Sequence, residues 1–303
     1  MNRRELLRGA GAAVTGAALG AMAAKLPKEA FAVVRKSAEA IRMPVTFTAH
    51  GNPMNAVRTT TFTKFLKTWK TKFPRPKAIL SVSAHWEGPA LAVTSGPKPD
   101  TIHDFYGFPQ DLYDVRYPAP GAPAVAERVR AVLKESGFAS SDEPARGLDH
   151  GCWSPLIHVF PAADVPVVQL SLLHGAPGDW HLNVGRALAP LRDEGVLIMG
   201  SGNLVHNLGS VDFERVDAPQ PSWSSQFDAW VKNQLDRWKL PSLANYLAES
   251  PDGRMSHPTA EHYVPLLVAA GAAEGEAQTK PSVSHVFEGF EHGTISMRSV
   301  QFS

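Results

Sequence analysis

The sequence predicts an α/β fold, in which a single layered domain has a central, largely buried sheet flanked by helices. From Met43 onward, short apolar runs alternate with helical stretches, a pattern typical of strands separated by helices. The chain has 303 residues and 44% of them are hydrophobic, which is enough for a sizeable core. No internal repeat or long low-complexity linker interrupts the pattern. We therefore expect one domain, over residues 43–303.

The elements follow from the spacing of the apolar residues. Residues 122–136, for example, carry Val125, Val129 and Val132 on one helical face. Residues 100–122 are rich in proline, glycine and aromatic residues and are long enough to be a substrate-covering loop. The predicted strands are 45–49, 78–84, 90–94, 165–173, 196–199, 283–288 and 294–301, and the predicted helices are 62–71, 122–136, 180–194, 222–238 and 259–270.

The first residues resemble a signal and not a part of the fold. Arg3 and Arg4 precede a stretch of small apolar residues, and residues 21–23 supply an A-x-A cleavage pattern, as in a twin-arginine export signal. We expect this signal at 1–24 and a linker at 25–42. The protein would then be periplasmic, without stable membrane association once the leader is removed. The alternative is a leader helix that stays in the cytoplasm.

Charge and cysteine content exclude several classes of protein. The formal net charge is +1, so the overall composition lacks the excess of basic residues that is typical of nucleic-acid-binding proteins. Cys152 is the single cysteine, so no intrachain disulfide can form. Twelve histidines accompany it, so any bound metal would be held by imidazole and carboxylate groups. A homodimer is expected only because such oligomers are common among enzymes.

Histidines recur where predicted strands end. His50 follows strand 45–49, His85 follows strand 78–84, and His206 comes after strand 196–199 and the turn GSGN. In open α/β sheets, ligands bind beyond the carboxyl ends of the strands. His262 is predicted to lie in the first turn of helix 259–270, from where it could point at the same edge. We therefore expect these four histidines to form a metal site.

The donor type restricts the metal and suggests catalysis. Imidazole suits zinc, iron, copper and nickel better than magnesium or calcium. A histidine-rich site without cysteine is unlike a closed structural zinc site, which usually uses thiolates. An open coordination position is the natural inference. Two further candidates are His150, between Asp149 and Gly151, and His103, on the predicted covering loop.

Six motifs in one order resemble the 4,5-DOPA extradiol dioxygenase family of the class III extradiol dioxygenases. They are AHGNPMN, SAHW, TIHDFYGFP, GLDHG-x-W-x-PL, GSGNLVHNL and HPTAEHY-x-PLL, and the likeness extends over residues 43–303. The resemblance implies a mononuclear non-haem metal site in an α/β fold. It puts His50, His85 and His262 at ligand positions, and His206 at the position of either a fourth ligand or an acid–base residue. His150, and with it His103, would line the substrate pocket, with His150 assisting proton transfer.

The resemblance also implies the reaction. One divalent metal ion per chain, Fe(II) for activity or Zn(II) as bound, would act on a small aromatic diol such as a DOPA-like catechol together with O₂. Because Glu261 is adjacent to His262, either side chain could bind the metal. Two other functions use the same histidines: a zinc-dependent hydrolase, whose metal would activate water, and a metal-binding member of the fold without catalysis.

Overall fold

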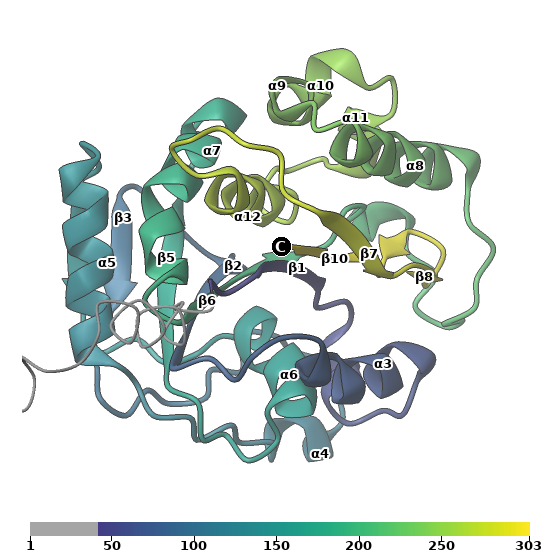
Figure 1. Cartoon of the computed structure of the whole chain (residues 1–303). Helices are drawn as coiled ribbons and strands as arrows, with labels where there is room; N and C mark the ends of the chain where they lie inside the picture. The colour runs from purple at the N-terminus through teal and green to yellow at the C-terminus, as the bar shows by residue number, and fades with distance from the viewer. Residues whose placement is uncertain (1–41) are drawn as a thin grey trace, which may run out of the picture. The chain divides into compact units, whose positions relative to one another are not determined.

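The computed structural model describes residues 42–303, which form one compact unit with a central sheet between helices (Figure 1). The predicted export signal at 1–24 and all of the predicted linker except Arg42 lie outside the described residues. Within the described part of the chain, no helix combines the length and the apolar character needed to cross a membrane. The α/β layered architecture predicted from the sequence is confirmed.

The sheet has eight strands in the order β4-β3-β5-β2-β6-β1-β10-β7. Neighbours within the central group β5-β2-β6-β1 are parallel, whereas β10 pairs antiparallel with β1 and β7 pairs antiparallel with β10. A separate pair, β8 and β9, forms a small hairpin. The bounds are β1 Val45–Ala49, β2 Ala78–Gly88, β3 Leu91–Thr94, β4 Ser140–Glu143, β5 Val167–Leu173, β6 Val196–Gly202, β7 Val283–Phe287, β8 Phe290–Glu291, β9 Ile295–Ser296 and β10 Ser299–Phe302.

Helices cover both faces of this sheet. Helix α12 packs on β6 and β1 from one side of the sheet. Helix α6 packs on the other side, and α3 lies next to α6 (Figure 1). The longer helices and helical turns are α3 Thr61–Trp69, α4 Gln110–Tyr113, α5 Pro123–Glu135, α6 His150–Val159, α7 Gly178–Leu188, α8 Ser222–Asp236, α9 Leu240–Ala244, α10 Tyr246–Glu249, α11 Gly253–Ser256 and α12 Val264–Glu274, and the 3-10 turns are η1 Pro53–Ala56, η2 Lys70–Lys72, η3 Ala189–Arg192 and η4 Leu208–Ser210.

The strand sequences explain why both faces are covered. Side chains alternate between the two faces of a strand, and both faces carry apolar residues here. In β2, Leu80 and Val82 join the core under α12, whereas Ile79 joins the core under α3 and α6. In β6, Ile198 belongs to the first core and Met199 to the second. A sheet that is apolar on both faces is stable only when helices bury both.

Two differences from the predicted elements affect the candidate site. Strand β2 continues to Gly88, so His85 lies within it. Its register against β5 shifts between Val82 and Glu87, so the SAHW segment bulges out of the ladder. The last helix begins at Val264, with Pro265 in its first turn, and not at residue 259. Proline suits a first helical turn because its missing N–H has no partner there, and His262 therefore precedes the helix.

Three other differences concern the rest of the chain. Helix α6 was not predicted, because its residues are buried almost all round and Pro155 lies inside it, which hides any helical period. The short edge strand β4, whose sequence is SSDE, has no apolar pattern. The predicted strand 294–301 divides into β9 and β10, and between them Arg298 turns to form a buried ion pair with Asp228 of α8.

Candidate metal centre

Three buried or half-buried imidazoles converge at the carboxyl edge of the parallel strands. His50 follows β1, His85 lies in the bulge of β2, and His262 precedes α12. The Nε2 atoms of His50 and His85 are 3.1 Å apart. The ring centroid of His262 lies 5.2 Å from that of His50 and 5.0 Å from that of His85. The three rings therefore surround one point, although they come from distant parts of the sequence.

The tautomer of His50 follows from a short hydrogen-bond chain. Nδ1 of His50 lies 3.1 Å from Oγ of Ser201, and the Ser201 hydroxyl donates its proton to the carbonyl oxygen of Gly151. A serine hydroxyl has one proton, so Ser201 can only accept from His50. The proton of His50 is therefore on Nδ1, and Nε2 presents its lone pair to the common point.

The carbonyl of Gly151 is available because of a proline one turn later. In α6, the N–H of residue 155 would normally bond to the carbonyl of residue 151, but Pro155 has no N–H. Gly151 itself leaves room for the site. A Cβ at this position would lie 2.3 Å from Oγ of Ser83, 3.0 Å from Cδ2 of His85 and 3.3 Å from Nδ1 of His50.

The other two imidazoles also have a carboxylate near Nδ1. Oε1 of Glu261 lies 3.0 Å from Nδ1 of His262 in a hydrogen bond, and Oδ2 of Asp104 lies 3.4 Å from Nδ1 of His85. Nε2 of His262 is buried and has no hydrogen-bond partner within the described residues. A partner on Nδ1 fixes the tautomer of a metal-binding histidine and turns Nε2 to the metal.

The geometry and donor set fit one divalent transition metal. Imidazole nitrogens, among them the buried and otherwise unpaired Nε2 of His262, suit zinc or iron. Two groups of possible donors have ligand atoms within 4.8 Å of one another: His50, His85 and His150 form one, and His206, Glu261 and His262 form the other. The first group holds two of the three predicted ligands and the second holds the third, and the ring of His262 lies beside those of His50 and His85.

His206 lies beside this centre in a stacked arrangement. Its ring is parallel to that of His262, with centroids 3.4 Å apart and an interplanar angle of 7°. The backbone N–H of His206 bonds to the carbonyl of Ser256, which fixes the segment after β6. Burial, followed by the nearby His257 and His150, lowers the pKa of His206 to about 3, so its ring is neutral at pH 7.

His150 belongs to the same cluster, whereas His103 does not. The ring of His150 lies 3.9 Å from that of His85 and 5.4 Å from that of His50, measured between centroids. His103 does not line the pocket at this centre. Its Nε2 instead lies 3.1 Å from the carbonyl oxygen of Val115, and its ring packs near Trp153. The structure thus brings together five of the six predicted site histidines.

Burial disfavours the charged forms of His50 and His262. The pKa of His50 is lowered well below its usual value by burial and then by His85 and His150. Burial and then His206 do the same to the pKa of His262. Asp104 behaves in the opposite way: burial raises its pKa, but its contacts with His150 and His85 outweigh that effect and bring the pKa to about 2. Neutral imidazoles beside an ionised carboxylate are ready to bind a cation.

A pocket of about 590 Å³ opens over the centre. Ligand pockets of 300–1,000 Å³ are typical of small-molecule sites. Tyr106 at its rim is 91% exposed, so the pocket is accessible from solvent. Apart from the histidines, most of the wall is apolar or aromatic: Met54, Phe105, Tyr106, Phe108, Leu208, Val211, Phe213 and Ile295.

Sequence reasoning did not find the residues that orient the imidazoles. Asp104, Ser201 and Gly151 were not singled out as site residues, and Glu261 was considered only as a possible ligand. Asp104 directly follows His103 in TIHDFYGFP, and Ser201 lies in GSGNLVHNL. Their place inside motifs that carry histidines was the available signal, but no spacing rule says which imidazole each one contacts.

Comparisons with known proteins agree with the geometry. The family model described as the catalytic LigB subunit of aromatic ring-opening dioxygenase matches residues 43–297. A protein of Escherichia coli strain K12 named 4,5-DOPA dioxygenase extradiol is 45% identical over 264 residues, which cover 86% of this chain and 94% of that protein. A protein of the same name from Beta vulgaris is 41% identical over 262 residues, which cover 85% of this chain and 95% of that protein.

A solved structure supports the same assignment. The crystal structure of an uncharacterised protein from Escherichia coli K12 is similar with a TM-score of 0.73 and 38% identity, covering 86% of this chain and all 100% of that one. The resemblance drawn from the six motifs is thereby confirmed. The chain belongs to the family of the catalytic LigB subunit of aromatic ring-opening dioxygenases.

Proposed function

We propose that this protein is an extradiol dioxygenase that opens the ring of a catechol with O₂ at one metal ion held by His50, His85 and His262. The observation that carries the proposal is the shared orientation of these imidazoles. Each has an acceptor at Nδ1, supplied by Ser201, Asp104 or Glu261, so that each Nε2 keeps its lone pair for a metal. Glu261 thus orients His262 and is not itself a ligand.

A bound ferrous ion would supply the electron transfer that ring cleavage needs and would favour loss of the catechol protons, whereas zinc has no redox chemistry. The surrounding side chains hold the substrate and move its protons. We assign this proton transfer to His206 and His150, because an imidazole beside a metal centre can accept a proton and return it.

The stacking of His206 supports an acid–base role over that of a fourth ligand. The nitrogen lone pair of an imidazole lies in the plane of its ring. The rings of His206 and His262 are nearly parallel, with centroids 3.4 Å apart, so their lone pairs do not point at one common atom. With His262 as ligand, His206 is left to face the substrate from the pocket wall. Its lowered pKa keeps the ring unprotonated at neutral pH.

The pocket supports an aromatic substrate that carries an anionic substituent, as in a DOPA-like catechol. Its aromatic and apolar wall suits a ring, and its volume of about 590 Å³ is that of a drug-sized ligand. Within residues 42–303, Arg58 is the one lysine or arginine on the wall. A guanidinium pairs well with a carboxylate, so Arg58 is placed to hold the acidic end of the substrate.

Anaerobic reconstitution with Fe(II) tests this proposal. Air and a panel of catechols are then added while O₂ uptake and the yellow ring-opened product are measured. We expect turnover with Fe(II), none with Zn(II), and none in a His206→Ala variant even where metal is retained. Metal-dependent turnover of an ester or amide without O₂ uptake would indicate the hydrolase instead. Tight metal binding without any turnover would indicate a non-catalytic member of the fold.

We also propose that residues 1–24 direct the protein to the periplasm, on the basis of the Arg3-Arg4 pair and the apolar stretch that follows it. Replacing both arginines by lysine should abolish export. Comparing periplasmic and cytoplasmic yields of the two forms measures this, and an unchanged periplasmic yield would refute the assignment.

A further inference from the structure

We propose that Asp104 is a positioning residue that fixes the orientation of the metal ligand His85 and of the proton-transfer residue His150. We also propose that it couples the orientation of both rings to the position of the pocket wall. The inference rests on the proposed metal site. It adds a function for the segment 104–109, which we call the aromatic loop and which contains Phe105, Tyr106 and Phe108.

One carboxylate faces three nitrogen atoms. Oδ1 of Asp104 accepts a hydrogen bond from the backbone N–H of His150 at 2.9 Å. Oδ2 lies 3.0 Å from Nδ1 of His150 and 3.4 Å from Nδ1 of His85. His85 belongs to β2 and His150 is the first residue of α6. Asp104 therefore joins the bulged strand β2 to the beginning of helix α6.

The chemistry of the carboxylate decides what this contact does. An ionised carboxylate accepts hydrogen bonds and cannot donate them, so it favours a proton on Nδ1 of both imidazoles. Nε2 of His85 then keeps its lone pair, and this atom is the one 3.1 Å from Nε2 of His50. Loss of the carboxylate would free both rings to rotate or to change tautomer.

The same residue begins the aromatic loop. On its N-terminal side, the chain is anchored, because Ile102 accepts a hydrogen bond from the indole of Trp153 and its N–H bonds to the carbonyl of Leu148. On its C-terminal side, Phe105 packs near the ring of His150, with centroids 5.5 Å apart, and Tyr106 is exposed at the rim. The position of the pocket wall and the orientation of the two imidazoles thus depend on one side chain.

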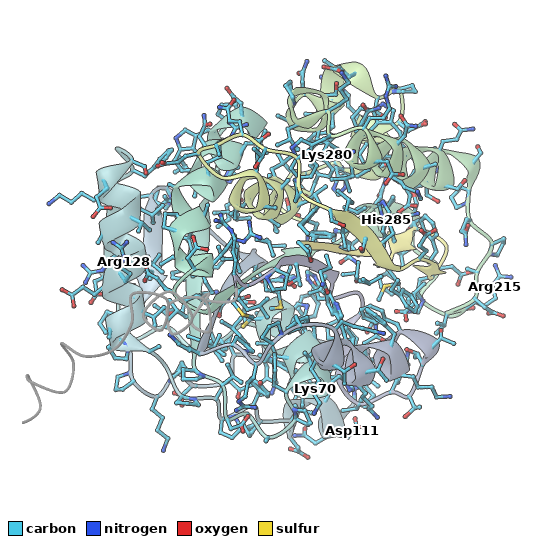
Figure 2. All side chains as sticks on the ribbon, in the orientation of Figure 1. Lys70, Asp111, Arg128, Arg215, Lys280 and His285 are labelled. Carbon is cyan, nitrogen blue, oxygen red and sulfur yellow. The ribbon has the colours of Figure 1, made fainter. Side chains whose placement is uncertain are left out.

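Zinc and cobalt binding test the role of Asp104 without relying on dioxygenase activity. The variants are Asp104→Asn, which is nearly isosteric, and Asp104→Ala. The control is Asp111→Asn, an aspartate a few residues along the same segment, on α4 at the outside of the molecule (Figure 2). Zinc affinity is measured by competition with a chromophoric chelator, and the cobalt-loaded protein is examined by its visible absorption spectrum.

We expect both Asp104 variants to bind zinc about 10- to 100-fold more weakly, the usual effect of removing an outer partner of a ligand histidine, and to show an altered cobalt spectrum. The control should match the wild type. In the Fe(II) enzyme, kcat should fall more than KM rises, because His150 is misplaced as well. A merely structural residue would lower thermal stability but leave the cobalt spectrum unchanged.

The outcomes separate this inference from the proposed function. Wild-type zinc affinity and an unchanged cobalt spectrum in Asp104→Asn would overturn the positioning role, whatever the activity. If Asp104→Ala does not fold, Asp104→Asn decides alone. Weakened zinc binding in these variants, combined with a wild-type protein that cleaves no catechol, would support the inference while the proposed dioxygenase function fails.

Discussion

Replacing Gly151 by alanine should weaken metal binding and also lower the stability of the fold, and the two effects can be measured separately. The new Cβ would lie 2.3 Å from Oγ of Ser83, about 1.1 Å closer than ordinary contact, which begins near 3.4 Å. It would also press on Cδ2 of His85 at 3.0 Å and approach Nδ1 of His50 at 3.3 Å. Two of the three proposed ligands would therefore have to move.

The magnitude follows from these contacts. Ser83 cannot easily move away, because its hydroxyl donates to the buried Asp149 at 2.7 Å, and loss of that bond costs about 1 kcal/mol. Overpacking adds about 1–3 kcal/mol, and the better helix propensity of alanine within α6 offsets up to about 1 kcal/mol. We expect a net loss of about 1–4 kcal/mol in unfolding free energy. Displaced ligands should lower zinc affinity by about tenfold or more.

Two assays on purified protein measure the effects separately. Urea unfolding of the metal-free protein gives the stability change, and chelator competition gives the zinc affinity. Gly88→Ala is the matched control, because the nearest atom to its Cβ would be a carbonyl oxygen at 3.4 Å. If Gly151→Ala binds zinc as tightly as the wild type does, then the reasoning about this close approach is wrong.

Four further predictions rest on separate features. Ser201→Ala should lower zinc affinity about tenfold, because Nδ1 of His50 loses its acceptor; chelator competition measures this, and an unchanged affinity would contradict the proposed tautomer. Arg58→Gln should reduce kcat/KM about fivefold for a catechol with a carboxylate, because the loss of one partly exposed ion pair has an effect of about this size. The same variant should leave kcat/KM for 4-methylcatechol unchanged, and equal losses for both substrates would argue against recognition of the carboxylate by Arg58. Cys152 is fully buried and burial raises the pKa of its thiol, so a thiol reagent should label it only after unfolding, and rapid labelling of the native protein would disprove this. Burial lowers the pKa of His181 to about 4 from 6.5. Between these two pH values the unfolded chain binds a proton at His181 and the native state does not. The contribution of neutral His181 to the unfolding free energy is therefore fully present above pH 6.5 and falls by about 3 kcal/mol as the pH drops to 4. In His181→Leu the slope of stability against pH in this window should decrease by about 1.4 kcal/mol per pH unit, as followed by urea unfolding, and an unchanged slope would rule out His181 as the source.

Many of the strands and helices could be predicted from the sequence, because the residue patterns that indicate them lie within short segments of the chain. Strand β1 and the branched residues that begin β6 are predicted by short apolar runs, and α5 by the spacing of its valines. Helix α6 could not be read in this way. Its sequence HGCWSPLIHV is buried on nearly every side and includes a proline, so it lacks the polar face from which a helical period is recognised.

The histidines of the site were also predictable, since a strand that ends in histidine is a feature of the chain itself. His50, His85, His206 and His262 were expected to lie at one edge of the sheet, and the structure brings them together with His150. For His103 the sequence suggested a place on the pocket wall, but the structure turns its ring to Trp153 and Val115. The loop has no periodicity that would tell which of its side chains point inward.

By itself, the sequence determined the layered α/β class, the order of most elements and the imidazole character of the site, since these depend on residue type and near-neighbour spacing. The tertiary structure alone decided which nitrogen of each imidazole faces the centre. That choice depends on contacts between residues far apart in the chain, such as Ser201 with His50 and Asp104 with both His85 and His150. Hydrogen bonds act over about 3 Å in space, and no spacing along the chain encodes which distant groups folding will bring within that reach.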